Sequence, residues 1–168
     1  MGLFSATLNT MEDLYLDQLQ DIYDAEQRLT KALPQMAKAA HSPELKRAFE
    51  THLKETEGQI KRLERCFDLF GKKPKSKTCD AMKGLISEGE TVVNATGDPD
   101  VKDAALIAAA QRVEHYEIAG YGCLRQFAMR CGQGNAAELL QETLDEEEKT
   151  DRLLTEIAES SVNVKAAS

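Results

Sequence analysis

The stretch VEHYEIAGYGCL, residues 113–124, places a carboxylate in a row of apolar and aromatic side chains. Val113, Glu117, Tyr121 and Leu124 recur at helical spacing, so they share one face of a helix. An ionised carboxylate is strongly disfavoured in an apolar interior. Glu117 must therefore be exposed, protonated, paired with another group or bound to a metal ion.

A second carboxylate, Glu26, interrupts an apolar row in the first half of the chain. That row consists of Tyr15, Leu19, Ile22, Leu29, Leu33 and Met36. When the chain is compared with itself at an offset of 91 residues, Glu26 falls on Glu117 and Glu55 falls on Glu146. Two helical hairpins related by a pseudo-twofold axis would bring these four glutamates to one level of a bundle.

Helix signals divide the chain into four long helices and one short helix. The sequence predicts long helices at about 10–40, 43–70, 99–131 and 135–160, and a shorter one at 78–95. Ser42 and Asp98 are suited to cap helices, and each precedes a proline suited to the first helical position. Because residues 71–98 are long enough to run the length of a bundle, we expect a crossover there. The predicted fold is all-α: a ferritin-like four-helix bundle with a long crossover that contains a short extra helix, forming a single domain over residues 1–168.

Composition narrows the functional class. A net charge of −8 argues against a basic nucleic-acid-binding surface, and no apolar run approaches the length of a membrane span. The N-terminus lacks the basic region and long apolar core of a signal peptide. The four cysteines have no C-x-x-C spacing and are interpreted as reduced, mostly packed thiols. We expect a cytoplasmic protein that binds neither nucleic acid nor membrane.

The carboxylates suggest a metal site, although the usual dimetal motif is incomplete. That motif needs a Glu from each of two helices and a Glu-x-x-His from each of the other two. Here Gly58 follows Glu55 by three positions, and Lys149 follows Glu146 by three. The candidate metal ligands are therefore Glu26, Glu55, Glu117 and Glu146, with Glu114, Glu147, Gln59 and His52 as substitutes. Such oxygen-rich ligands suit iron or manganese.

Two questions stay open at this point. The repeat favours Glu146 as the ligand from the fourth helix, whereas the apolar register favours Glu147. The alternative to a metal site is a metal-free helical dimer that acts through its surface, with the core glutamates protonated or sharing hydrogen bonds. Gly120 and Gly122 cost helix stability and imply close approach of another helix, from the same chain or a second subunit.

Four segments resemble the YciF/YciE-like family of bacterial stress proteins. They are DAEQRL, HLKETEGQIKRLE, DAALIAAAQRVEHYEIAGYG and ETLDEEEKTDRLL, one from each long helix. The resemblance implies a ferritin-like bundle that forms a homodimer. It also implies a dimetal site built from Glu26, Glu55, Glu117, with Glu114 beside it, and Glu146 or Glu147. The chemistry expected at such a site is ferrous oxidation or peroxide consumption, and no residue is assigned a catalytic role.

Overall fold

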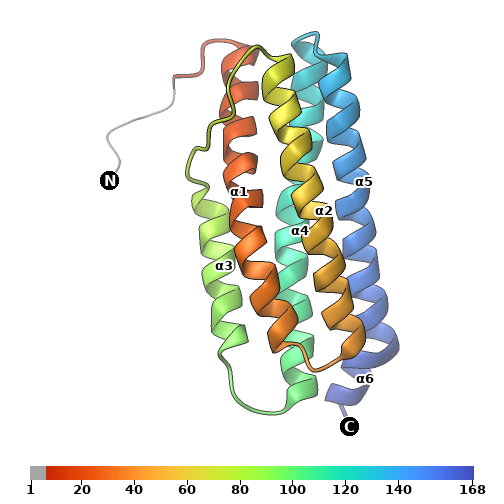
Figure 1. Cartoon of the computed structure of the whole chain (residues 1–168). Helices are drawn as coiled ribbons and strands as arrows, with labels where there is room; N and C mark the ends of the chain where they lie inside the picture. Colours follow the sequence, from red (N-terminus) through yellow and green to blue (C-terminus); the bar gives the residue numbers. More distant parts are fainter. Residues whose placement is uncertain (1–6) are drawn as a thin grey trace.

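The computed structural model describes residues 7–168 and shows a helical bundle with no strand in that range (Figure 1). Its elements are α1 (Met11–Ala39), α2 (Pro43–Leu69), α3 (Asp80–Val93), α4 (Pro99–Arg130), α5 (Gly134–Ile157), the π-helical turn η1 (Ala158–Val162) and α6 (Asn163–Ala166). The predicted all-α, ferritin-like four-helix bundle is confirmed. None of these helices is long and apolar enough to cross a membrane.

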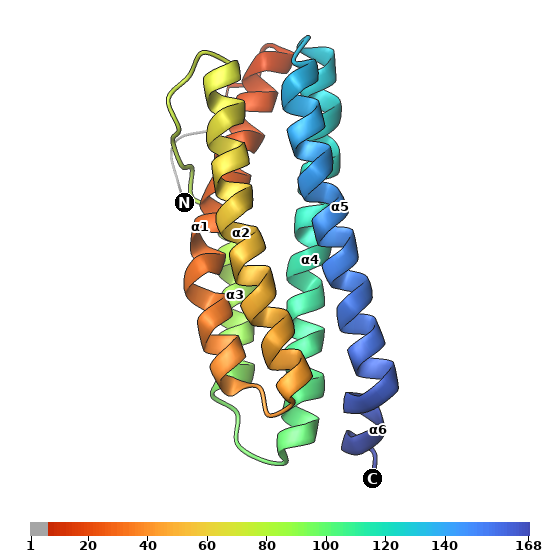
Figure 2. The same ribbon diagram turned by 45° about the vertical axis from the view of Figure 1, so that its right-hand side comes forward.

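Four long helices form the bundle, and neighbouring helices run antiparallel. The chain descends α1, rises along α2, rises again along α4 and descends α5 (Figures 1 and 2). The two rising helices can be parallel because the segment between them returns the chain to the other end of the bundle. This crossover carries α3, which packs against α1 and α4.

Local sequence determines where the helices begin. Thr10 Oγ1 accepts a hydrogen bond from the backbone of Asp13, whose carboxylate accepts one from the Thr10 backbone. Ser42 Oγ accepts from the backbone of Leu45 at the start of α2, and Asp98 caps α4 in the same way. These side chains satisfy backbone N–H groups that have no partner within the helix.

A buried aspartate in α4 holds the turn between α1 and α2. Asp103 Oδ1 accepts a hydrogen bond from the His41 backbone at 2.8 Å, and Oδ2 accepts one from the Ser42 backbone at 2.6 Å. Both contacts span more than 60 residues of sequence. Because they depend on tertiary packing, helical periodicity does not reveal this role of Asp103.

Chain ends commonly fray, so we expect the last residues, 162–168, to be loose, but residues 162–166 are helical in the structure. Helix α5 ends at Ile157 and continues through η1 into α6. Ala158 and Val162 are buried and belong to the apolar core, with Val162 only 2% exposed. Burial of these two apolar side chains holds the start of the segment against the core.

A close approach of two helices explains one of the two glycines in α4. A Cβ atom on Gly120 would overlap the side chain of Ile22 in α1, whereas one on Gly122 would meet nothing within 4 Å. Gly120 therefore permits contact between α1 and α4 of the same chain.

The core has two apolar clusters, separated along the bundle by a layer of polar side chains. One cluster contains Leu29, Phe49 and Leu154, and the other contains Tyr15, Leu63 and Leu140. The buried polar residues between them are Glu26, His52, Thr56, Gln59, Glu114, Glu117, Glu147 and Thr150. The name "polar layer" is used below for these eight residues.

Candidate metal centre

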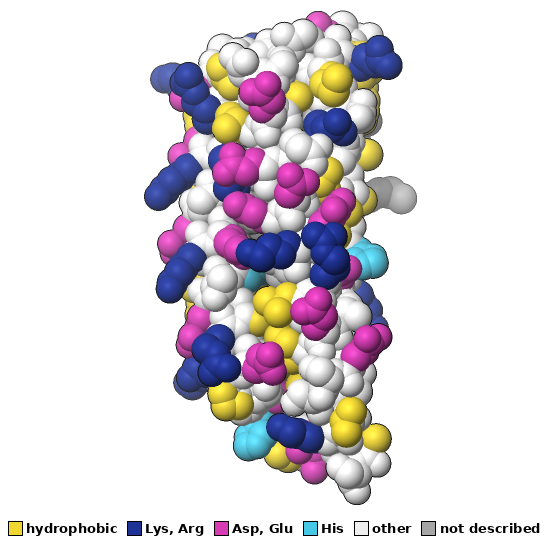
Figure 3. Space-filling view, turned by 90° about the vertical axis from the view of Figure 1, so that its right-hand side faces the viewer, with side chains coloured by type: hydrophobic (Ala, Val, Ile, Leu, Met, Phe, Trp, Pro, Cys, Tyr) yellow, Lys and Arg dark blue, Asp and Glu magenta, His cyan; other side chains and the backbone are white. Residues whose placement is uncertain are grey.

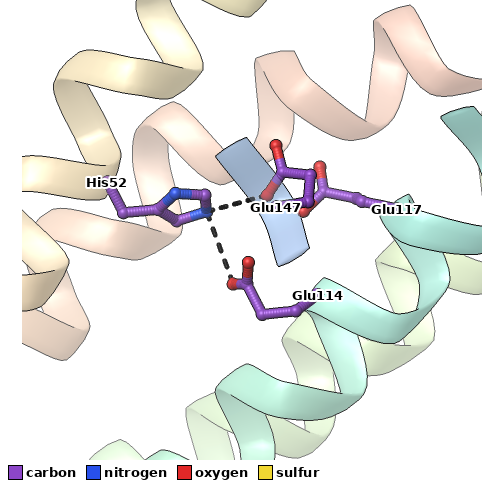
Figure 4. Close-up of side chains that lie close together, drawn as sticks. All are labelled: His52, Glu114, Glu117 and Glu147. Carbon is purple, nitrogen blue, oxygen red and sulfur yellow. Dashed lines mark ion pairs between the residues drawn. The ribbon is translucent and has the colours of Figure 1, made fainter. Parts of the chain in front are cut away.

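The polar layer contains four side chains whose potential ligand atoms converge. One ligand atom from each of His52, Glu114, Glu117 and Glu147 lies within 4.8 Å of the others (Figure 4). Helix α2 supplies the histidine, α4 supplies two glutamates one turn apart, and α5 supplies the fourth residue. None of the four is more than 2% exposed. These four residues are called the His52 cluster below.

The imidazole of His52 faces carboxylates without forming hydrogen bonds to them. Its Nε2 lies 3.4 Å from Glu114 Oε1 and 3.7 Å from Glu147 Oε2 (Figure 4). Both separations exceed ordinary hydrogen-bond distances for N–H···O pairs. On the other edge of the ring, Nδ1 lies 3.5 Å from the Thr150 hydroxyl. The two separations from Nε2 match those between two ligand atoms of one ion, each about 2.1 Å from it.

With the carboxyl groups ionised, several buried atoms of the His52 cluster have no hydrogen-bond partner within the described chain. They are His52 Nε2, Glu114 Oε2 and both carboxylate oxygens of Glu117 and of Glu147. Leaving buried polar atoms unsatisfied costs free energy, and native proteins contain few of them. A cation coordinated by these nitrogen and oxygen atoms would satisfy them together. The donor set therefore fits a metal ion.

Glu26 extends the polar layer toward α1. It is fully buried, and its Oε1 accepts a hydrogen bond from the Tyr121 hydroxyl, while Oε2 has no partner. Two atoms of α2, Thr56 Oγ1 and Gln59 Oε1, are also buried without partners. The unsatisfied oxygen atoms therefore continue beyond the His52 cluster into the half of the layer that contains Glu26.

Burial and mutual repulsion keep protons on these carboxyl groups in the absence of a cation. Burial, reinforced by Glu147, raises the pKa of Glu26 to about 8. Burial is also the main cause of the raised pKa values of Glu114, Glu117 and Glu147. The four carboxyl groups thus share protons near neutral pH, and a bound cation would displace them.

The carboxylates around His52 raise the pKa of its imidazole. Burial alone would lower it, but the surrounding carboxylates, Glu114 foremost, outweigh burial and raise the pKa to about 10. A metal ligand must be neutral imidazole, so metal binding at His52 also requires loss of a proton. The proton balance of the site is therefore coupled to its occupancy.

Glu146 does not join the His52 cluster. Arg62 contacts it through two hydrogen bonds, at 2.5 and 2.8 Å, and Gln59 Nε2 donates a third at 3.1 Å. Its side chain is 24% exposed, whereas Glu147 is fully buried. Of the two α5 candidates, the structure places Glu147 inside, in agreement with the apolar register and against the 91-residue repeat.

Glu55 also lies outside the cluster, next to it. Its Oε2 is 3.7 Å from His52 Nδ1, and its Oε1 is 4.0 Å from Lys149 Nζ. Its side chain is 24% exposed. Glu55 and Glu146, which the 91-residue repeat aligns, thus occupy similar positions, but both are at the margin of the polar layer rather than within it.

Two polar residues of the layer were absent from the candidate ligands. Thr56 lies midway between Phe49 and Leu63 at seven-residue spacing, on the apolar face of α2, and this position was the available signal. Thr150 faces His52 from α5. Tyr121, interpreted from sequence as a core aromatic residue, is fully buried and in addition donates a hydrogen bond to Glu26.

Residues 10–167 match the family described as a domain of unknown function, DUF892. The chain belongs to the DUF892 family. It is 48% identical over 160 residues to protein YciF of Escherichia coli strain K12, a match that covers 95% of this chain and 96% of that protein. The resemblance identified from the helical segments is thereby confirmed.

Solved structures of DUF892-like chains share the fold. The E. coli stress protein YciF superposes with a TM-score of 0.89 at 47% identity, covering 92% of this chain and 98% of the other. YcfI of Rhodopseudomonas palustris, described as a candidate structural protein, gives 0.87 at 43% identity, covering 91% and 98%. A protein from Xanthomonas campestris gives 0.73 at 26% identity, covering 92% and 95%.

Proposed function

We propose that this DUF892 protein binds iron(II) or manganese(II) at the His52 cluster and acts in a stress response through that centre. The observation that carries the proposal is the set of converging, fully buried ligand atoms that have no partner within the described chain. Three carboxylates and one imidazole form a donor set suited to these ions. The stress role is inferred from the relative described as the stress protein YciF.

A second cation position is proposed beside Glu26. Glu117 and Glu147 interact electrostatically with Glu26 as well as with one another. Both carboxylate oxygens of Glu117 and of Glu147 have no hydrogen-bond partner in the described chain, so each of these carboxylates has an oxygen free for a second ion. The single histidine makes the two halves unequal, so we expect the position at His52 to bind its ion more tightly.

The chain itself would control the environment of such a centre. A bound iron or manganese ion would supply redox chemistry, which here would be ferrous oxidation or peroxide consumption. Full burial of Glu26, Glu117 and Glu147 limits the access of water. Tyr121 holds one oxygen of Glu26 in place. The carboxyl groups would release protons on binding such an ion and would take them up again on its loss.

Thermal unfolding with added metal tests this proposal. A ligand that binds only the native state stabilises it by linkage, by about 2.7 kcal/mol at a hundredfold excess over Kd. Iron(II) under anaerobic conditions, or manganese(II), should raise the Tm of the metal-free protein. The variants Glu114→Gln and Glu147→Gln should lose most of that shift. Glu138→Gln, at an exposed position on α5, should retain it.

The second candidate function is a metal-free dimer that acts through its surface. An apolar groove of about 480 Å³ lies between α1 and α3, with Leu85, Ile86 and Val93 among its lining residues. The R. palustris relative is described as a candidate structural protein. Under this alternative the protein would be a dimer of the 18.6 kDa chain by light scattering, and metal would leave its Tm unchanged.

A further inference from the structure

The His52 cluster is enclosed, so an ion needs a route through the surrounding side chains. Its four residues are at most 2% exposed. Two carboxylates with partly exposed side chains, Glu55 and Glu146, lie where the polar layer approaches the surface between α2 and α5. The face that includes α5 carries interspersed acidic and basic side chains at mid-height of the bundle (Figure 3).

The two carboxylates differ in how firmly they are held. Glu146 is fixed by two charge-assisted hydrogen bonds from Arg62 and one from Gln59. Glu55 has only long contacts, 4.0 Å to Lys149 Nζ and 3.7 Å to His52 Nδ1. Lys149 is itself 72% exposed, so this pair holds Glu55 weakly. Glu55 is therefore the carboxylate that can change its rotamer at low cost.

Glu55 also lies between solvent and the imidazole of His52. Its side chain is 24% exposed, and its Oε2 lies 3.7 Å from Nδ1 of His52. The far edge of that ring, at Nε2, is buried without a hydrogen-bond partner and faces Glu114 and Glu147. A divalent cation bound at Glu55 would thus lie across the imidazole ring from Glu114 and Glu147.

We infer that Glu55 takes up a divalent cation from solvent and passes it past His52 into the cluster, and that Lys149 opposes this step by occupying Glu55. This inference rests on the proposed function, because it concerns how the same centre is loaded. Glu55 is then a residue of the uptake route and is not a ligand of the bound ion.

This role has a kinetic consequence that a ligand role does not have. A group that stabilises only the passage of the ion lowers the barrier equally in both directions. Removing it slows loading and release by the same factor and leaves Kd unchanged. A ligand, by contrast, stabilises the bound ion, so removing it raises Kd chiefly through faster release.

Cobalt(II) binding, followed by its visible absorption in a stopped-flow instrument, measures both rates on the full-length protein. Loading is recorded on mixing with cobalt(II), and release on mixing the loaded protein with an excess of chelator. Glu55→Gln should slow both about tenfold, within the range that local charge produces in association rates. Lys149→Gln should accelerate loading severalfold at low salt, and added salt should reduce the difference.

Two matched variants separate the possible outcomes. Glu57→Gln removes the same charge from an exposed position of α2 and should leave both rates unchanged. Glu114→Gln, within the cluster, should raise Kd for cobalt(II). If Glu55→Gln loads as fast as the unmodified protein, or raises Kd as much as Glu114→Gln does, the inference is wrong while the metal site stands. If the unmodified protein binds no cobalt(II), both the proposed function and the uptake route are wrong.

Discussion

The hydroxyl of Tyr121 on α4 donates a hydrogen bond to Oε1 of Glu26 on α1, across 95 residues of sequence. Both side chains are fully buried. This contact satisfies one oxygen of a carboxyl group whose other oxygen has no partner in the described chain. It joins the Glu26 half of the polar layer to one of the two apolar clusters, because Tyr121 packs within that cluster.

Replacing Tyr121 with Phe should lower the free energy of unfolding of the metal-free protein by about 1–3 kcal/mol, the usual cost of leaving a buried acceptor unsatisfied. Urea denaturation measures the change. The matched control is Tyr23→Phe, which removes a 2.9 Å hydrogen bond to the partly buried Glu64 and should cost less. Equal losses in the two variants would contradict a special role for the Tyr121–Glu26 contact.

The metal-free protein should lose stability as the pH rises from about 5 to 9. The pKa of Glu26 increases on folding from 4.5 to about 8, so the native state retains a proton that the unfolded chain releases. Its contribution is complete below pH 4.5 and is lost as the pH passes through 8. His52 acts in the same direction, because its pKa increases from 6.5 to about 10. Urea unfolding at pH 5.5, 7 and 8.5 with chelator present tests this, and stability that rises over that interval would refute it.

Glu117→Gln should leave the metal-free protein at least as stable at pH 8, while abolishing the Tm shift produced by metal. Burial and the proximity of Glu26 raise the pKa of Glu117 well above its ordinary value, and a glutamine resembles the protonated acid in shape and charge. Differential scanning calorimetry with and without manganese(II) measures both effects. A large destabilisation without metal would show that ionised Glu117 makes favourable contacts in the native state.

The glycines of α4 should respond to alanine in opposite ways. Gly120→Ala places a Cβ against Ile22, and such overpacking typically costs about 1–3 kcal/mol. Gly122→Ala meets nothing within 4 Å and should stabilise the helix by up to about 1 kcal/mol through higher helix propensity. Thermal unfolding of the two variants checks the difference. Equal effects would mean that α1 and α4 do not approach one another at Gly120.

The fold was predictable because its signals are local. Ser42 with Pro43, and Asp98 with Pro99, mark helix starts in a way that depends only on the neighbouring backbone. The position of Asp103 beneath the turn between α1 and α2, and the burial of Val162 in the core, could not be read from sequence. Both follow from contacts between segments distant in the chain.

The sequence also predicted that the candidate site lies inside the bundle, because Glu26 and Glu117 each interrupt an apolar row. Both residues are fully buried in the structure. The ligand set was harder to predict because the two hairpins are not equivalent at this level. His52 has Thr143 as its counterpart at an offset of 91 residues, and Thr56 has Glu147. Repeat symmetry therefore indicated Glu55 and Glu146, whose ion pairs with Lys149 and Arg62 become evident only when α2 and α5 are packed together.

An anomalous-difference map from crystals loaded with iron(II) or manganese(II) tests the central claim most directly. The account predicts a peak bounded by His52 Nε2 and the carboxylates of Glu114, Glu117 and Glu147, at about 2.0–2.3 Å from its ligand atoms. An empty His52 cluster in such crystals, or a peak only at surface carboxylates such as Glu142, would contradict it.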